Sequence, residues 1–210
     1  VFWLPVQVCC GVALADSPED KGISLVERAE AAMSASKDTG TYYNFFTEEL
    51  SAAIGERHYL ESHLAEALDK NEMSVHYQPM ICIKTRRVMG AEALIRWQNP
   101  ILGAVAPDRF IYLAEQNGKI LALGNFVLRT EMDKAAQWRK SFGGDFCIAV
   151  NMSPVQFRDD NLVSRIAQLL AYYRLPGSSL ELEITEVVLL QDEKKAAKAI
   201  AGLLNLVVRI

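Results

Sequence analysis

The stretch MSVHYQPMICIKTRRVMGAEALIRW, residues 73–97, decides how the chain is expected to fold. Two segments within it, 74–83 and 88–97, have the apolar and β-branched composition of strands. Only the four polar residues 84–87 separate them. Because a connection of this length is too short for a crossover helix, we expect the two strands to pair antiparallel.

Strand-like and helical patterns alternate through the rest of the chain. Two helices are expected first, over 107–117 and 123–142, and then a strand over 146–151, a helix over 159–173, a strand over 179–185, a helix over 192–204 and the start of a strand over 206–210. Repeated strand–helix units are typical of a parallel sheet or of a barrel covered by helices. We therefore expect an α/β fold.

The first 71 residues have a different pattern. Residues 6–14 indicate a buried strand, a helix is expected to begin at the capping box of Ser24 and Glu27, and residues 42–46 indicate a short closing strand. The polar stretch 47–71 carries leucines spaced four apart. This spacing predicts a helix whose apolar side chains form a single stripe that packs against the rest of the protein. We expect the domain boundary in this stretch.

Composition excludes some partners and compartments. Half of the 210 residues are apolar, and the net charge is -4. Such a chain lacks the basic field that holds a nucleic-acid backbone, so polymeric DNA or RNA is not an expected partner.

Cysteines 9, 10, 82 and 147 do not show the two-residue spacing of zinc or redox pairs. They are expected to be reduced thiols in a cytoplasmic protein.

The apolar run over residues 1–15 superficially resembles a signal peptide. No Lys or Arg precedes Lys21, however, and Pro5 interrupts the run. The run is also too short to span a bilayer, and no other segment reaches the required length. We expect neither a membrane anchor nor membrane contact in this stretch of protein.

Three oxygen-bearing side chains occupy equivalent places in successive strand units. Glu92 lies within the second expected strand, Asn151 ends the third, and Glu183 lies near the end of the fourth. In barrels of this type the strand ends on one rim converge. Carboxylate and amide oxygens suit Mg²⁺ or Mn²⁺ better than zinc. The pattern therefore predicts a divalent-metal site, although each residue alone equally fits an ordinary half-exposed strand.

Five ordered blocks across residues 73–190 resemble the EAL domain family. They are Tyr77-Gln78-Pro79 with Gly90-Ala91-Glu92-Ala93-Leu94-Ile95-Arg96-Trp97, Pro107 with Phe110-Ile111, Ala114-Glu115 with Gly118, Asn151-Met152-Ser153 with Gln156-Phe157, and Leu182-Glu183-Ile184-Thr185-Glu186. An isolated Glu-Ala-Leu would carry no weight, but five blocks in order are specific. The resemblance implies an incomplete TIM-like (β/α) barrel with one antiparallel strand, in agreement with the short turn at 84–87.

The resemblance also implies a reaction. EAL domains are metal-dependent phosphodiesterases that hydrolyse cyclic di-GMP to linear pGpG with two divalent cations. Carried over by motif, Glu92 and Glu183 would be catalytic and would bind Mg²⁺ or Mn²⁺ together with Asn151. A regulatory module that binds cyclic di-GMP without turnover is the alternative. The presence of Glu92 favours the enzyme, because degenerate sensors often lack that residue.

Substrate contacts follow from the same motifs. Gln78, Leu94 and Arg96 would contact cyclic di-GMP, and the planar guanidinium of Arg96 suits a phosphate. Glu186 would organise a loop at the rim near the metals. Without the motif, Arg96 would be read as a surface residue packing beside Trp97, and Glu186 as a solvent-facing side chain.

The first 46 residues resemble the C-terminal end of a GGDEF domain. The match lies in Cys10-Gly11-Val12-Ala13-Leu14-Ala15, in Ala29-Glu30-Ala31-Ala32-Met33, and in Lys37 with Gly40 and Tyr43. The Gly-Gly-Asp-Glu-Phe motif is absent from the sequence, so no cyclase activity is expected. The expected organisation is a small α+β GGDEF remnant over 1–46, a helical linker over 47–71 and the N-terminal part of an EAL domain over 72–210.

Other motifs of the EAL family would lie beyond Ile210. The family continues into an Asp-Asp-Phe-Gly segment and later supplies a Lys, a Glu and a Gln to the same rim. We therefore expect this chain to be truncated and inactive by itself. Family members often dimerise through the EAL domain, and the parent protein can carry upstream sensor or membrane domains.

Overall fold

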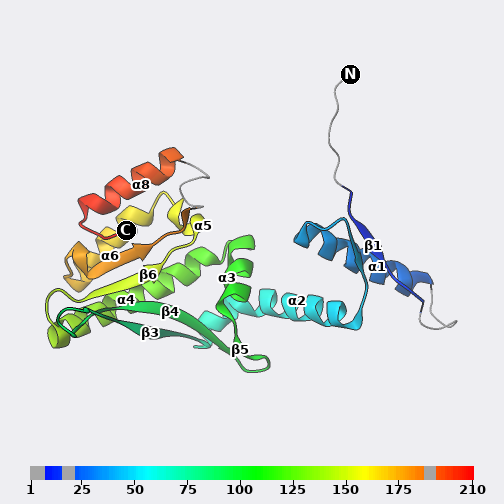
Figure 1. Cartoon of the computed structure of the whole chain (residues 1–210), viewed down its shortest axis with the longest axis horizontal. Coiled ribbons are helices and arrows are strands. Elements are labelled where there is room, and N and C mark those ends of the chain that lie inside the picture. The colour runs from blue at the N-terminus through cyan, green and yellow to red at the C-terminus, as the bar shows by residue number, and fades with distance from the viewer. Residues whose placement is uncertain (1–7, 16–21, 187–192) are drawn as a thin grey trace, which may run out of the picture. The chain divides into compact units, whose positions relative to one another are not determined.

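The computed structural model describes residues 8–15, 22–186 and 193–210. The chain divides into two compact units, Val1–Ser62 and His63–Ile210 (Figure 1). The first unit is a small βαβ arrangement, and the second contains the larger sheet. Helix α2 (Glu48–Asp69) runs from the first unit into the second. The helical stretch expected over 47–71 is present as this helix.

The first unit contains one βαβ motif made of β1 (Cys10–Val12), α1 (Gly22–Thr39) and β2 (Tyr43–Phe45). The two strands pair parallel, and α1 packs against both. Gly11 allows this packing, since a Cβ there would lie 1.8 Å from the carbonyl oxygen of Ala29. The buried Ser36 hydroxyl donates to the carbonyl of Cys10 over 3.1 Å, which ties the helix to the strand.

Two expectations for this unit need correction. Of the described residues 8–15 only three form a strand, so the expected strand over 6–14 is too long. Helix α1 already includes Gly22, which places Ser24 inside the helix instead of before it. Ser24 therefore does not act as the expected cap, because a cap residue precedes the first helical turn.

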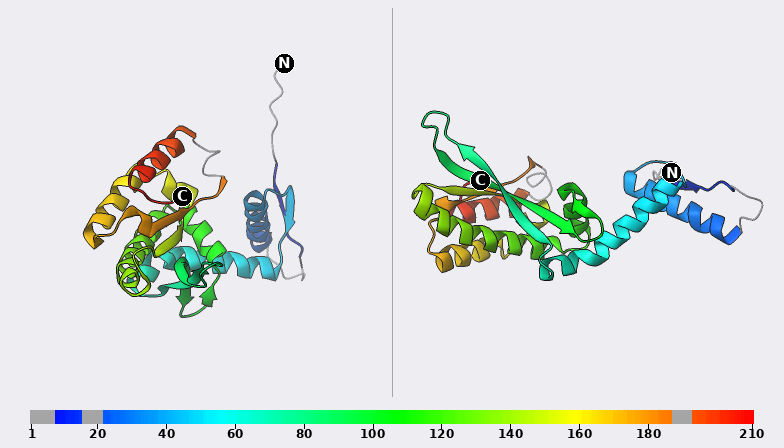
Figure 2. Two further views of the ribbon diagram at one scale, coloured as in Figure 1. Left: turned by 60° about the vertical axis from the view of Figure 1, so that its left-hand side comes forward. Right: turned by 90° about the horizontal axis from the view of Figure 1, so that it is seen from below.

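The second unit is built on one mixed sheet of β3 (Met73–Ile81), β4 (Val88–Asn99), β5 (Gly103–Val105), β6 (Cys147–Asn151) and β7 (Leu180–Glu183). The strand order is β3-β4-β6-β7, with β5 paired to β4. β3 and β4 pair antiparallel, whereas β4–β6 and β6–β7 pair parallel. The expected antiparallel hairpin is confirmed, and Figure 2 shows it projecting beyond the rest of the sheet.

Helices connect the strands and cover one face of this sheet. They are α3 (Pro107–Gln116), α4 (Ile120–Phe142), α5 (Pro154–Phe157), α6 (Leu162–Tyr173), a 3-10 turn (Gly177–Ser179) and α8 (Glu193–Asn205). The apolar core lies between the sheet and α4, α6 and α8. It includes Ala91, Ala93, Ile148, Val150, Leu180 and Leu182 from the strands and Leu128, Met132, Ile166, Leu170 and Leu203 from the helices. The α/β class expected from the sequence is confirmed.

The sheet is open. β3 lies at one end of the strand order and β7 at the other, and no strand in the described part of the chain joins these ends. Beyond β7, the described residues add to the sheet an isolated parallel bridge between Glu181 and Arg209. The strand expected over 206–210 is therefore a single bridge, held by a hydrogen bond from the Leu182 amide to the carbonyl of Arg209 over 2.9 Å.

Some elements were not expected. β5 and α5 are short, and α4 begins three residues before the expected start at 123. All four cysteines are free thiols, as expected. Each helix in the described ranges falls short of the length or the apolar character that crossing a bilayer requires.

A glutamate is buried in the core side of the second unit. Glu131, on α4, is 1% exposed. Its Oε1 accepts a hydrogen bond from the Tyr77 hydroxyl over 3.2 Å, and its Oε2 has no hydrogen-bond partner among the described residues. Burial raises the pKa of Glu131 to about 7, although the hydrogen bond from Tyr77 and the nearby charge of Lys134 oppose that rise. The carboxyl group is therefore largely protonated below neutral pH.

Replacing this carboxyl group tests its effect on stability. The folded pKa of about 7 lies above the ordinary 4.5, so the folded state binds the proton more tightly and stability falls as pH rises from about 4.5 through 7. We expect Glu131→Gln to stabilise the second unit at pH 8 by up to roughly 3 kcal/mol, at about 1.4 kcal/mol per pKa unit. The gain should be much smaller at pH 5. Denaturant titrations at both pH values measure the difference.

The matched control is Asp145→Asn, which removes a carboxylate from an exposed position of the same unit. Its effect should be small and similar at the two pH values, since surface substitutions usually change stability little. A Glu131→Gln protein that loses stability equally at pH 5 and pH 8 would contradict the assignment of a neutral buried acid.

Candidate functional site

The register of the sheet brings the expected site residues to one face. Gln78 lies opposite Glu92 between β3 and β4, and Asn151 lies opposite Glu183 between β6 and β7. Glu92 is in register with Ala149, two residues before Asn151. Because side chains alternate along a strand and partners in register share a face, these polar residues lie together on the face opposite the helix-packed core.

Direct contacts join three of these positions. Asn151 Nδ2 donates a hydrogen bond of 2.7 Å to Glu92 Oε1. The backbone amide of Met152 donates to the carbonyl of Glu183 over 2.9 Å. These hydrogen bonds hold Glu92 and Glu183 next to Asn151, although they lie 59 and 32 positions from it in the sequence. The arrangement presents two carboxylates and one amide oxygen on the same surface.

Negative charge accumulates at this surface. Partial burial raises the pKa of Glu183 above its ordinary value, and the nearby charges of Glu92 and Glu181 raise it further. A divalent cation would offset this repulsion, so the donor set fits Mg²⁺ or Mn²⁺, which prefer oxygen ligands. The described residues contain no cluster of three or more His, Cys, Asp or Glu side chains suited to a metal. Water or substrate would have to complete the coordination.

The expected substrate residues lie beside the carboxylates. Leu94 and Arg96 alternate with Glu92 on the same strand, so they share its face. Both are half-buried, whereas Gln78 is exposed. Arg96 Nη1 donates to the carbonyl of Ile95 over 2.8 Å. The guanidinium still has other N–H groups available, since arginine carries five donors.

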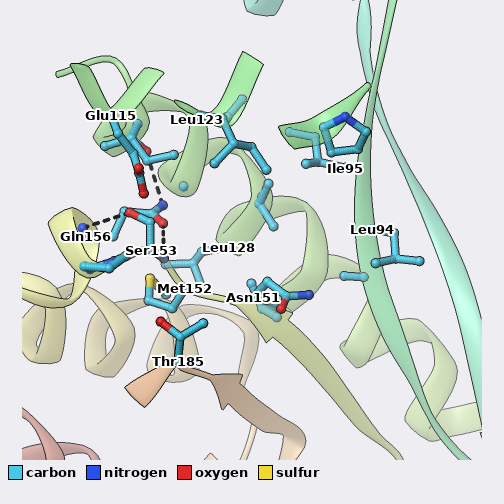
Figure 3. Close-up of a pocket in the computed structure, with 18 of the residues that line it drawn as sticks. Leu94, Ile95, Glu115, Leu123, Leu128, Asn151, Met152, Ser153, Gln156 and Thr185 are labelled. Atoms are coloured by element: carbon cyan, nitrogen blue, oxygen red, sulfur yellow. Dashed lines mark hydrogen bonds between the residues drawn. The ribbon is translucent and has the colours of Figure 1, made fainter. Parts of the chain in front are cut away.

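A cavity of about 380 Å³ lies on the helix-covered side of the sheet, between the ends of β4 and β6 and helices α3 and α4 (Figure 3). Leu94, Arg96 and Asn151 line it, whereas Glu92, Glu183 and Gln78 do not. Its other walls come from β6, α3, α4 and the turn after Asn151. They are largely apolar, with residues such as Ile111, Leu123, Val127, Leu128 and Met152, and they include the polar side chains of Glu115 and Gln156.

The turn that follows Asn151 is tightly organised. Ser153 caps the short helix α5 by accepting from the Gln156 amide over 3.3 Å, and the Gln156 side chain accepts from the Ser153 amide over 2.9 Å. From the sequence, these two residues were read only as part of a motif. Their spacing is that of a capping box, Ser-x-x-Gln, which could have revealed the structural role.

Glu186 lies at the end of a described segment and is exposed. Residues 187–192, which follow it, lie outside the described residues. Its expected role in organising a rim loop therefore stays a prediction. The roles of Glu92, Asn151, Glu183, Gln78, Leu94 and Arg96 as ligands also stay predictions, although their placement on one face is observed.

Comparisons with known proteins agree with this geometry. The family model described as "EAL domain" matches residues 61–210. MucR of Pseudomonas aeruginosa, a bifunctional diguanylate cyclase/cyclic di-GMP phosphodiesterase, is 33% identical over 188 residues, which are 89% of this chain and 27% of MucR. The cyclic di-GMP phosphodiesterase PdeR of Escherichia coli is 31% identical over 200 residues, which are 94% of this chain and 30% of PdeR.

A solved structure is also similar. The PaMucR phosphodiesterase, determined as a cyclic di-GMP complex, has a TM-score of 0.68 and is 32% identical, covering 71% of this chain and 61% of that chain. The chain thus spans less than a third of the length of the two curated relatives. The similarity covers the sheet and helices that position the candidate site.

Removing one carboxylate tests the electrostatics of the site. Without divalent metal, we expect Glu183→Gln to raise the melting temperature by about 2–4 °C, because it relieves repulsion worth roughly 1 kcal/mol. Adding Mn²⁺ should stabilise the parent protein by mass action and should have little effect on the variant. Thermal melts in chelator and in Mn²⁺ measure both effects.

Glu181→Gln is the control, because Glu181 alternates with Leu182 and lies on the same face of β7 as Glu183. It removes the same charge without removing a candidate ligand, so most of the Mn²⁺ stabilisation should remain. Equal stabilisation of the Glu183→Gln variant and the parent by Mn²⁺ would remove Glu183 from the candidate donor set.

Proposed function

The chain belongs to the EAL domain family, and from that premise we propose that it forms part of a cyclic di-GMP phosphodiesterase, which hydrolyses one phosphodiester bond to give linear pGpG. The observation that carries the proposal is the grouping of Glu92, Asn151 and Glu183 on one sheet face, with Arg96 on the same face of β4. The activities printed for MucR and PdeR and the ligand of the PaMucR complex support it.

Glu92, Asn151 and Glu183 would hold Mg²⁺ or Mn²⁺, with Glu92 and Glu183 as the catalytic carboxylates. When bound, such cations neutralise phosphate charge and make water a stronger nucleophile at neutral pH. The protein's contribution is to keep the three donors fixed before substrate arrives. The 2.7 Å hydrogen bond from Asn151 to Glu92 and the register of the strands keep the three donors in place.

The neighbouring residues would orient the substrate. The Arg96 guanidinium can pair two N–H groups with phosphate oxygens, which fixes the direction of the phosphodiester. Gln78 lies opposite Glu92 and offers an amide to a polar group, and Leu94 offers an apolar contact.

Binding of cyclic di-GMP without turnover is the second candidate function. The observation in its favour is that the sheet carrying the three donors is open in the described residues, so the rim that would hold a second cation is incomplete. Measuring pGpG release and nucleotide affinity on the same preparation separates the two functions.

The organisation of the chain is part of the proposal. We place a GGDEF remnant over 1–46, a helical linker over 47–71 and the N-terminal part of the EAL domain over 72–210. The parallel βαβ motif of the first unit is compatible with the GGDEF assignment. The natural protein would act in the cytoplasm, where its nucleotide substrate signals, and would dimerise through the EAL domain as family members often do.

The open sheet supports the proposal that the natural protein continues beyond this chain. Parallel barrels close by pairing their first and last strands, and neither end of the strand order is paired in this way in the described residues. Further strands would also bring further carboxylates to the same rim. We therefore propose that the metal site is completed outside residues 1–210.

Two substitutions in the natural protein test the assigned roles. Glu92→Ala should reduce turnover in Mg²⁺ or Mn²⁺ by about 100-fold or more, because a lost ligand removes charge stabilisation in the transition state. Arg96→Ala should mainly raise KM, because its phosphate contact exists in the ground state and the transition state alike. Steady-state measurement of pGpG release checks both outcomes.

Gln98→Ala is a suitable control, because Gln98 is an exposed residue of β4 outside the site. Its kcat and KM should match those of the parent. Parent-like kinetics of Glu92→Ala or of Arg96→Ala would refute the corresponding role. Tight binding of cyclic di-GMP by the parent without any pGpG would favour the second candidate function.

Residues 1–210 by themselves should be inactive and prone to self-association. The open sheet leaves strand edges that can pair with other chains, and the catalytic groups lack the support of a closed barrel. Gel filtration should show soluble aggregates, and pGpG release in Mn²⁺ should be at background. A monodisperse chain with turnover near that of the natural protein would contradict this expectation.

A further inference from the structure

The side-chain amide of Gln156 joins the turn after Asn151 to helix α4. Its Oε1 accepts from the Ser153 amide over 2.9 Å, and its Nε2 donates to the carbonyl of Ile120 over 3.1 Å. Gln156 is 8% exposed; its hydrogen bond to Ile120 is buried, and the one from Ser153 is partly buried. Figure 3 shows these bonds beside the cavity, between the turn and the first turn of α4.

Gly124 makes this connection possible. A Cβ at position 124 would lie 1.8 Å from Gln156 Nε2 and 3.0 Å from the amide carbon. Any other residue would therefore push the amide away from α4. This glycine lies inside a helix, where glycine costs about 1 kcal/mol relative to alanine, so the close approach is a reason for its presence.

The turn held by Gln156 carries Asn151. Directly after Asn151, the Met152 amide donates to the carbonyl of Glu183, and the Ser153 amide donates to Gln156 Oε1. The turn is thus attached to β7 on one side and to α4 on the other. The side chain of Asn151, two residues before Ser153, reaches Glu92 Oε1 over 2.7 Å.

We infer that Gln156 is a positioning residue for the candidate metal site, with Gly124 as the position that gives its amide room. Gln156 contacts none of the three donors directly. It holds the turn so that Asn151 stays next to both Glu92 and Glu183. Groups that orient metal ligands from outside the coordination shell commonly change metal affinity about 10–100-fold when they are replaced. The inference rests on the proposed function, because it concerns the donors of that site.

Gln156→Met and Gly124→Ala in the natural protein test it. Methionine keeps the length of the side chain but removes both hydrogen bonds, and alanine at 124 displaces the amide. Each should weaken Mn²⁺ binding about tenfold or more. Cyclic di-GMP affinity in chelator should change less than about twofold, because Gln78, Leu94 and Arg96 are carried by β3 and β4. Calorimetry measures both affinities.

A double substitution isolates the steric argument. Once Gln156→Ala has removed the amide, adding Gly124→Ala should cause little further loss of Mn²⁺ affinity, because nothing occupies the space of the new Cβ. If the two substitutions each weaken Mn²⁺ binding and their effects multiply in the double variant, Gly124 acts independently of the Gln156 amide. The assigned role of Gly124 would then fail.

Asn99→Ala is the matched structural control. Asn99 is 2% exposed, and its Oδ1 accepts from the amides of Ile101 and Leu102 over 3.0 and 2.9 Å. It should lower thermal stability about as much as Gln156→Met while leaving Mn²⁺ affinity unchanged.

Unchanged Mn²⁺ affinity in Gln156→Met would overturn the inference. A parallel loss of Mn²⁺ and nucleotide binding in Gln156→Met would also overturn it if Asn99→Ala, contrary to expectation, showed the same loss, because that would indicate general destabilisation. A parent protein that binds neither Mn²⁺ nor cyclic di-GMP would instead refute the proposed function itself. The last outcome is recognisable before any variant is made.

Discussion

The pairing register of β3, β4, β6 and β7 is the constraint on which the rest of the second unit depends. Because side chains alternate along a strand, a slip of one residue would move every side chain of that strand to the other face. In the observed register, Glu92, Asn151 and Glu183 lie on one face, and Ala93, Val150 and other apolar residues lie on the other. The same pairing therefore determines both the core and the candidate site.

Carboxyl groups on the two faces of the sheet differ in burial and in the cause of their raised pKa. On the core side, Glu131 is 1% exposed and burial raises its pKa to about 7, so the group avoids a buried charge by holding a proton. On the open face, Glu92 and Glu183 remain partly exposed, and partial burial together with the charge of Glu92 raises the pKa of Glu183. A cation can relieve that repulsion, which makes the open face the suitable place for a metal.

Much of this arrangement follows from the sequence. The four-residue connection at 84–87 predicted the antiparallel pair, and the strand–helix alternation predicted the parallel pairs. The equivalent places of Glu92, Asn151 and Glu183 in successive strand units predicted their proximity. Such features depend on local periodicity and on connection length, which can be read along the chain.

Other features depend on contacts that the sequence does not display. β5 exists because it pairs with the extension of β4, and the burial of Glu131 depends on how α4 meets β3. The role of Gln156 requires the close approach of Gly124, 32 residues earlier in the chain. Tertiary packing decides each of these, so propensity and pattern alone could not.

The proposed function depends most on whether one face of this sheet can bind divalent cations. It is tested most directly by an anomalous-scattering map from crystals of the natural protein grown with Mn²⁺ and cyclic di-GMP. A metal peak is expected at coordination distance, about 2.1 Å by analogy with Mg²⁺, from side-chain oxygens of Glu92, Asn151 and Glu183. Bound nucleotide with no metal peak on this face, or with metal held by other residues, would contradict it.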